Sequence, residues 1–128
     1  MAGSFVYTPT AGTVLGAGSQ TLSVTFTPTD SADYVSVSSN VSLTVNRSSV
    51  VIVGAALPTP SYFGDRVTFT FTFTGTGITP TGTTTIKDGA VTLATVPLSA
   101  GAATLSTSAL AAGTHSLSAT YNGDANYQ

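Results

Sequence analysis

The sequence predicts an all-β protein of the sandwich type, and three observations support this prediction. Apolar and polar residues alternate in several runs, turn-forming residues separate these runs, and no helical stretch is long enough for a βαβ unit. Ser and Thr supply most of the polar side chains, and both favour strands and turns over helix interiors. Short strands at close spacing are typical of two sheets packed face to face.

Three alternating runs predict the clearest strands. Residues 67–74 place valine and phenylalanine on one face and threonine on the other, which is the two-residue period of a half-buried strand. Residues 21–26 and 41–45 follow the same period, with Leu, Val and Phe set against Ser and Thr. Because the run 67–74 is uncharged and has a high β-propensity, we expect it to be a central strand.

Turn-forming residues predict how these strands connect. Asp88-Gly89 stands between two short strands and predicts a two-residue hairpin, because both central positions of a type I′ turn need a positive φ. The segment 122–124, Asn-Gly-Asp, predicts a second turn.

The chain contains an internal match. Residues 15–26 align without a gap with residues 110–121, at an offset of 95 positions. The match continues from the segment 30–34 into the segment 124–127, after two extra residues in the first copy. A spacing of about 95 residues is the size of one sandwich domain.

Short motifs in the second part of the chain give it a family resemblance. They are TGT at 81–83, KDG at 87–89, AGTH at 112–115 and YNGDANY at 121–127. With these motifs, about residues 50–128 resemble the bacterial immunoglobulin-like repeats found in tandem on large secreted and surface proteins. The resemblance implies an immunoglobulin-like antiparallel β-sandwich, neighbouring repeats of the same kind in a longer parent, and an extracellular or cell-surface location. It identifies a scaffold and does not specify a ligand.

The match also predicts how the chain divides. Residues 1–45 look like the C-terminal half of a first repeat, residues 46–49 a linker, and residues 50–128 a second repeat without its last strand. In the first copy Tyr34 is followed by a strand, Val35 to Val45, that has no counterpart after Tyr127.

The strand Val35 to Val45 is the predicted replacement for the missing one. A strand of ten residues spans roughly 34 Å, whereas the linker 46–49 reaches at most about 14 Å. We therefore expect two chains to exchange this strand and form a homodimer.

Composition excludes several classes of protein. The net charge is −2 and the chain has only three basic residues, which disfavours nucleic-acid binding. The absence of cysteine rules out disulfides and thiolate metal sites. No apolar run is long enough for a membrane span, and the N-terminus lacks the pattern of a signal peptide.

Candidate metal ligands are restricted to aspartates in predicted turns. Asp in a turn usually accepts hydrogen bonds from its own backbone, and that is the role we expect. The alternative is a Ca²⁺ site, for which the available clusters are Asp30 with Asp33 and Asp124 with Asn126. We expect no other cofactor. The single histidine, His115, is expected to face solvent on a strand, and one histidine cannot build a multi-histidine metal site.

Aromatic residues offer a possible ligand-binding surface. Tyr62 and Phe63 are the candidates for an exposed platform on which a glycan could stack. Tyr34 and Tyr127 recur at equivalent positions of the two copies, which favours a structural role in tying a loop to a sheet.

The sequence therefore predicts a non-catalytic structural or adhesion-stalk module of a bacterial surface or secreted protein. The alternative is a carbohydrate- or surface-binding module that uses exposed aromatic side chains. An enzyme is not expected, because no feature brings two aspartates together and Gly75-Thr76-Gly77 lacks the pattern of a phosphate-binding loop.

Overall fold

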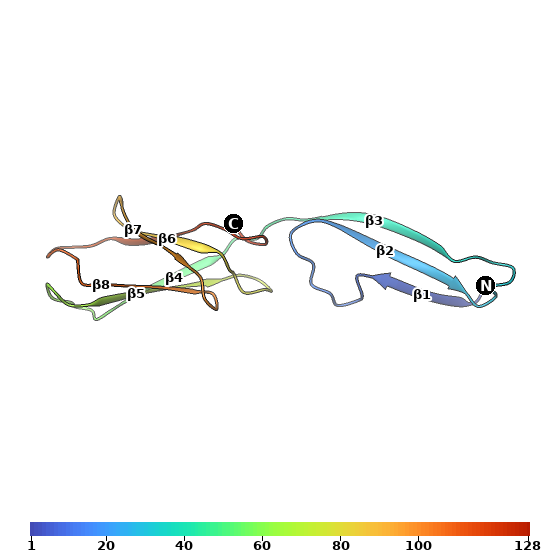
Figure 1. The fold of residues 1–128 in the computed structure, drawn as a ribbon, viewed down its shortest axis with the longest axis horizontal. Helices are drawn as coiled ribbons and strands as arrows, with labels where there is room; N and C mark the ends of the chain where they lie inside the picture. Colours follow the sequence, from blue (N-terminus) through green and yellow to red (C-terminus); the bar gives the residue numbers. More distant parts are fainter. The chain divides into compact units, whose positions relative to one another are not determined.

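The computed structural model describes residues 1–128, which divide into two compact units, Met1–Asn46 and Arg47–Gln128. Nine β-strands account for all the regular structure, so the all-β prediction is confirmed (Figure 1). No helix is present that could cross a membrane.

Unit 1 (Met1–Asn46) is one antiparallel sheet of three strands in the order β1-β2-β3. The strands are β1 (Gly3–Thr8), β2 (Gly18–Pro28) and β3 (Val37–Val45). Both alternating runs predicted here are strands, and β3 begins two residues later than predicted. The apolar side chains of this sheet stay largely exposed, for example Phe5 at 60% and Val41 at 61%.

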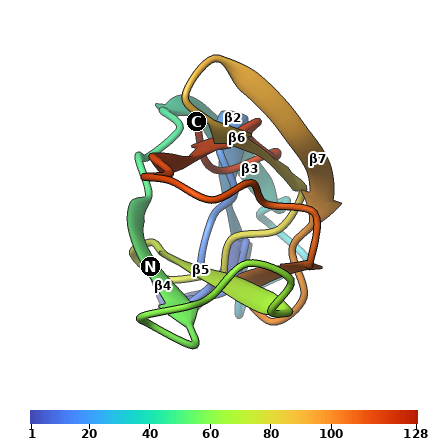
Figure 2. The same ribbon diagram turned by 90° about the vertical axis from the view of Figure 1, so that its left-hand side faces the viewer.

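Unit 2 (Arg47–Gln128) contains two antiparallel sheets of three strands each. One sheet has the order β4-β5-β8, from β4 (Val51–Leu57), β5 (Val67–Thr74) and β8 (Ala102–Thr107). The other has the order β7-β6-β9, from β7 (Val91–Pro97), β6 (Thr83–Asp88) and β9 (Leu117–Tyr121). Figure 2 looks along unit 2 and places β4 and β5 on one side, with β6 and β7 on the other.

The core of unit 2 lies between its two sheets and is built on β5. As predicted, β5 is the central strand of its sheet and turns its four apolar residues inward. Phe73 is 2% exposed and its ring lies 5.7 Å from that of Tyr121 on the facing sheet. Burying one such aromatic side chain contributes roughly 1.5–3 kcal/mol. The polar face of β5 carries threonines, and Thr68 and Ser106 lie with their hydroxyls 2.8 Å apart across to β8.

The hairpin between β6 and β7 is confirmed, but its turn differs from the prediction. Asp88 pairs with Val91, so the two loop residues are Gly89 and Ala90 rather than Asp88 and Gly89. Gly89 has a φ of 54°, and Ala90 keeps a negative φ, unlike both central positions of a type I′ turn. Asp88 belongs to the strand because its backbone also pairs with Leu117 of β9.

The boundary between the units lies inside the predicted linker. Ser48 nevertheless belongs to unit 2, because its N–H donates to the Asn126 carbonyl at 2.9 Å and its carbonyl accepts from Gln128 N at 2.9 Å. The structure of the single chain pairs β3 with β2. The assignment of unit 1 to half of a repeat remains a prediction, as does exchange of a strand between chains.

Candidate functional site

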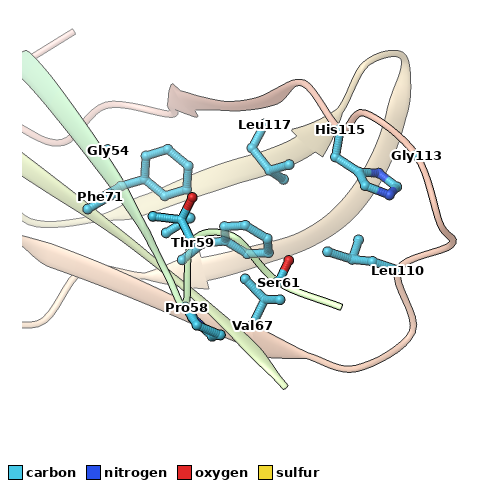
Figure 3. A pocket seen from close by; sticks show the side chains of 13 residues that line it. Gly54, Pro58, Thr59, Ser61, Val67, Phe71, Leu110, Gly113, His115 and Leu117 are labelled. Carbon is cyan, nitrogen blue, oxygen red and sulfur yellow. The ribbon is translucent and has the colours of Figure 1, made fainter. Parts of the chain in front are cut away.

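A groove on unit 2 is lined by polar and apolar surface in about equal parts. It has a volume of about 350 Å³ and lies beside β4, β5 and the segment that leads into β9. Val67, Phe69 and Phe71 of β5 contribute buried side chains to it. In Figure 3 the side chains of Val67, Leu110 and Leu117 face the same space, with His115 near its outer end.

His115 and Asp88 form a close pair at the rim of this groove. The Nδ1 of His115 lies 2.5 Å from Oδ2 of Asp88, and Nε2 lies 2.9 Å from the carbonyl oxygen of Ala111. The other carboxylate oxygen of Asp88 accepts a hydrogen bond from the N–H of Ser116 at 3.0 Å. Each of the two side chains is about three-quarters covered, with 24% of His115 and 23% of Asp88 exposed.

These contacts favour the charged forms of both residues. The carbonyl of Ala111 and the carboxylate of Asp88 both raise the pKa of His115 above its ordinary value. The hydrogen bond from His115 lowers the pKa of Asp88. Both ring nitrogens face oxygen acceptors, so the imidazolium form satisfies both contacts at once.

The prediction that His115 faces solvent is wrong. The residue precedes β9 instead of lying on it, and its ring folds back onto Asp88 and Ala111. This geometry locks the segment before β9 to the end of β6. Neither ring nitrogen is left to take a proton from a nucleophile, so the pair has the geometry of a structural clasp and not of a general base.

Asp124 closes the turn after β9. It accepts hydrogen bonds from the N–H groups of Asn126 at 2.7 Å and Tyr127 at 2.8 Å. It also accepts from the N–H and the hydroxyl of Thr81, both at 2.8 Å. Burial acts to raise the pKa of Asp124, but these four donors outweigh it and hold the pKa far below its usual range.

The candidate Ca²⁺ clusters lie in different units. Asp30 is in unit 1 and accepts hydrogen bonds from the N–H groups of Ala32 at 3.2 Å and Asp33 at 3.3 Å. Asp124 and Asn126 are in unit 2, where the carboxylate of Asp124 binds backbone donors. No group of three or more His, Cys, Asp or Glu side chains is arranged to hold a metal ion. The predicted role of Asp30 and Asp124 in capping their own turns is confirmed.

Tyr62 and Phe63 lie at the tip of the connection between β4 and β5. They are 78% and 82% exposed, and a hollow beside the groove is lined by both of them and by His115. Asp65 closes this tip, since its carboxylate accepts from the N–H of Tyr62 at 2.8 Å and its own N–H donates to the Tyr62 carbonyl at 3.0 Å. The tip therefore presents two adjacent aromatic rings to solvent.

The equivalent tyrosines of the two copies differ. Tyr127 is 2% exposed, and its hydroxyl lies within hydrogen-bonding distance of the Thr76 and Ile78 carbonyls at 2.6 and 2.5 Å. It ties the loop after β5 to the C-terminal turn, as predicted for a structural tyrosine. Tyr34 is 49% exposed.

Sequence analysis missed the clasp and the groove. Asp88 and His115 are 27 positions apart, and a pairing between them depends on β6 and β9 being neighbours in one sheet. Both residues stand inside motifs that carry the family resemblance, which was the signal available. The groove is lined by three separate stretches of chain, 54–61, 67–71 and 110–117, and had no sequence signal.

Comparison with known proteins agrees with this architecture. Neither the curated proteins nor the solved structures contained a match. Residues 54–128, more than half of the chain, match the family model described as bacterial Ig-like domain (group 3). These residues include all of β5 to β9, with both sheets of the sandwich and the turn closed by Asp124. The chain therefore belongs to the bacterial Ig-like domain family.

Proposed function

We propose that the chain is a non-catalytic structural module that spaces or supports other parts of a bacterial surface or secreted protein. Domains of this family commonly occur in extracellular or surface proteins and are generally non-catalytic. The proposal rests on one observation, which is that three ionisable side chains of unit 2 form their hydrogen bonds within the fold. Asp88, His115 and Asp124 all bind neighbouring elements of unit 2, so their charges stabilise strand ends and turns.

A structural module should resist extension as a cooperative unit. We therefore suggest stretching a polyprotein that contains the full chain by atomic force microscopy. Unit 2 should give one discrete unfolding event, which releases the contour length of its residues 47–128, about 290 Å at about 3.5 Å per residue, less the span of the folded unit. Gradual extension without a discrete event would contradict the proposed structural role.

A second candidate is binding of a carbohydrate or another surface through the aromatic tip at Tyr62 and Phe63. The specific observation in its favour is that both rings are exposed on a tip closed by Asp65. Aromatic side chains offer a large flat face and lose little conformational entropy on binding, so they are common contact surfaces.

A glycan array separates the two candidates. For a structural module we expect no saturable binding. If binding is seen, Tyr62→Ala should abolish it without changing the melting temperature, because Tyr62 is exposed. Tyr7→Ala is the matched control, since Tyr7 is 59% exposed on unit 1.

A further inference from the structure

The connection between β8 and β9 is anchored at its two ends and loosely held between them. It contains no regular secondary structure. Leu110 packs against the core near the beginning of the connection. Near its end, Ser116 forms hydrogen bonds to the carboxylate of Asp88 and to the backbone of Gly89. The four residues between these anchors, 111–114, are exposed and form what we call the strap.

A single hydrogen bond holds the strap. The carbonyl oxygen of Ala111 lies 2.9 Å from Nε2 of His115, and residues 112–114 form no hydrogen bond. Gly113 has a φ of 144°, and no atom lies within 4 Å of the place where a Cβ would be, so the backbone has room to change conformation there. The position of the strap therefore depends on the bond from His115.

The two nitrogens of the His115 ring face two different acceptors. Nδ1 faces the carboxylate of Asp88, and Nε2 faces the carbonyl of Ala111. An imidazolium ring has a proton on each nitrogen and donates to both acceptors, whereas a neutral ring has only one proton. The neutral ring keeps that proton on Nδ1, because a lone pair facing a carboxylate is less favourable than a lone pair facing a neutral carbonyl. Deprotonation therefore removes the proton on Nε2 and breaks the bond to the strap.

The strap also lines the hollow at the aromatic tip. Ala111, Ala112 and Gly113 contribute to its lining, together with Tyr62 and Phe63 from the connection between β4 and β5. Figure 3 shows the beginning and the end of this segment at the outer end of the neighbouring groove. A movement of the strap therefore changes the shape of the surface beside the two exposed rings.

We propose that residues 111–114 are a pH-dependent strap, closed on the hollow while His115 is doubly protonated and released when Nε2 loses its proton. The proton passes to solvent, to which 24% of the His115 side chain is exposed. The N–H at Nδ1 keeps its bond to Asp88, so the end of β6 stays attached to the segment before β9. The change is local, and unit 2 remains folded in both states. This switch depends on neither of the two candidate functions.

His115 is the group near the strap that changes its charge around neutral pH. Asp65 and Tyr62 are the other ionisable residues that line the hollow, and β9 carries none. On β6, Lys87 precedes Asp88 and points to the opposite face of the sheet. Among aspartate, tyrosine, lysine and histidine, only histidine ordinarily titrates between about pH 5 and pH 8. The backbone carbonyl and the carboxylate that His115 contacts raise its pKa, so the strap should be released above about pH 6.5.

Methyl NMR of the full chain tests the switch, because methyl protons do not exchange with water at high pH. Order parameters of the Ala111 and Ala112 methyl groups are measured between about pH 5.5 and pH 9, together with the titration of Cε1 of His115. The methyl group of Ala103, which is 2% exposed in the core, is the internal reference. We expect the order parameters in the strap to fall from about 0.85 to below about 0.6. The midpoint of this fall should coincide with the titration of His115, and the value for Ala103 should stay constant.

Asp88→Asn distinguishes this switch from a general loosening of the fold. The oxygen of the asparagine can still accept from the N–H of Ser116, while its amide donates to Nδ1 of a neutral His115 ring. The ring proton then lies on Nε2 and keeps the bond to the strap, so the strap should stay ordered up to about pH 9. His115→Gln is the matched control, and it should abolish the pH dependence because no titrating ring remains.

Three results would overturn the proposal. The first is a strap that keeps its order through the titration of His115 in the unsubstituted chain, which is decisive even if a variant does not fold. The second is a loss of order in Asp88→Asn at the same pH as in the unsubstituted chain, or a pH dependence that persists in His115→Gln. The third is a simultaneous loss of order at Ala103, which would show opening of the whole of unit 2.

Discussion

At the scale of single residues, position within the fold decides what an aspartate contributes. Asp30 and Asp124 occupy matching places in the two copies. Asp30 accepts two hydrogen bonds longer than 3.1 Å within its own turn. Asp124 accepts four bonds of 2.7–2.8 Å, and two of these come from Thr81 on a distant loop. The second carboxylate therefore links two parts of the sandwich, whereas the first shapes a local turn.

Replacing Asp124 with alanine should destabilise unit 2 by roughly 1–2 kcal/mol, because three partly or fully exposed N–H groups and one hydroxyl lose a charged acceptor. Urea unfolding followed by tyrosine fluorescence measures the change. Asp30→Ala is the control and should leave the transition of unit 2 in place. Equal effects of the two substitutions on that transition would contradict the assigned role.

The clasp between His115 and Asp88 predicts a pH dependence of stability. The pKa of His115 is raised on folding, so its contribution is complete below about pH 6.5 and is lost as the pH rises through the folded pKa. The pKa of Asp88 is lowered, so its contribution is present above about pH 4 and is lost on acidification. We expect the melting temperature of unit 2 to fall between about pH 6 and pH 9.

Asp88→Asn tests this dependence by removing the charge while keeping the size of the side chain. The melting temperature of this variant should change less between pH 6 and pH 9. An unchanged pH profile would show that another group is responsible.

At the scale of elements, the ends of strands are held by close packing as much as by hydrogen bonds. Gly75 directly follows β5, and its Cα faces the ring of Tyr127. A Cβ at this position would lie 2.5 Å from Cζ of Tyr127 and 2.8 Å from its hydroxyl. The glycine therefore permits the loop after β5 and the C-terminal turn to approach each other.

Gly75→Ala should destabilise unit 2 by roughly 1–3 kcal/mol, since the ring and the loop must separate. A double-mutant cycle with Tyr127→Leu gives the test, because leucine lacks the atoms that an added Cβ meets. The cost of Gly75→Ala should be clearly smaller in the Tyr127→Leu background. Additive effects would mean that the contact does not limit this position.

At the scale of the whole molecule, the two units differ in how much of their apolar surface is covered. Unit 2 buries the inner face of β5 and Ile86 of β6 between two sheets. Unit 1 has a single sheet, and its large apolar residues include Phe5, Tyr7 and Val41 at about 60% exposure each. The strands of unit 1 therefore have less packing to oppose their opening.

Native-state hydrogen exchange should report this difference. Amides of β5 and β6 should exchange only on global opening of unit 2, whereas amides of β1 to β3 should exchange through easier local opening. If β2 amides are protected as strongly as those of β5 at low concentration, unit 1 must be covered by something outside its own sheet.

The sequence by itself determined the fold class, the central strand β5 and the family. Alternation along residues 67–74 has a single structural solution, because a half-buried strand is the only regular element with a two-residue period. The turn at residues 122–124 was also predictable, since Asn, Gly and Asp carry their preference for turns locally. The predictions for the turn at Asp88-Gly89 and for the environment of His115 were wrong for the same reason. The true position of each residue depends on β6 being the neighbour of β9, and no local pattern shows this.

Only the tertiary structure decided which distant residues meet. The contact between Asp88 and His115, the reach of Asp124 to Thr81 and the groove beside Leu117 all arise when separate strands take neighbouring places. Periodicity and turn chemistry are local properties and leave strand order open. Burial of the apolar faces sets how the two sheets pack, and the strand order β7-β6-β9 within one sheet brings Asp88 to His115 and places β9 at the edge.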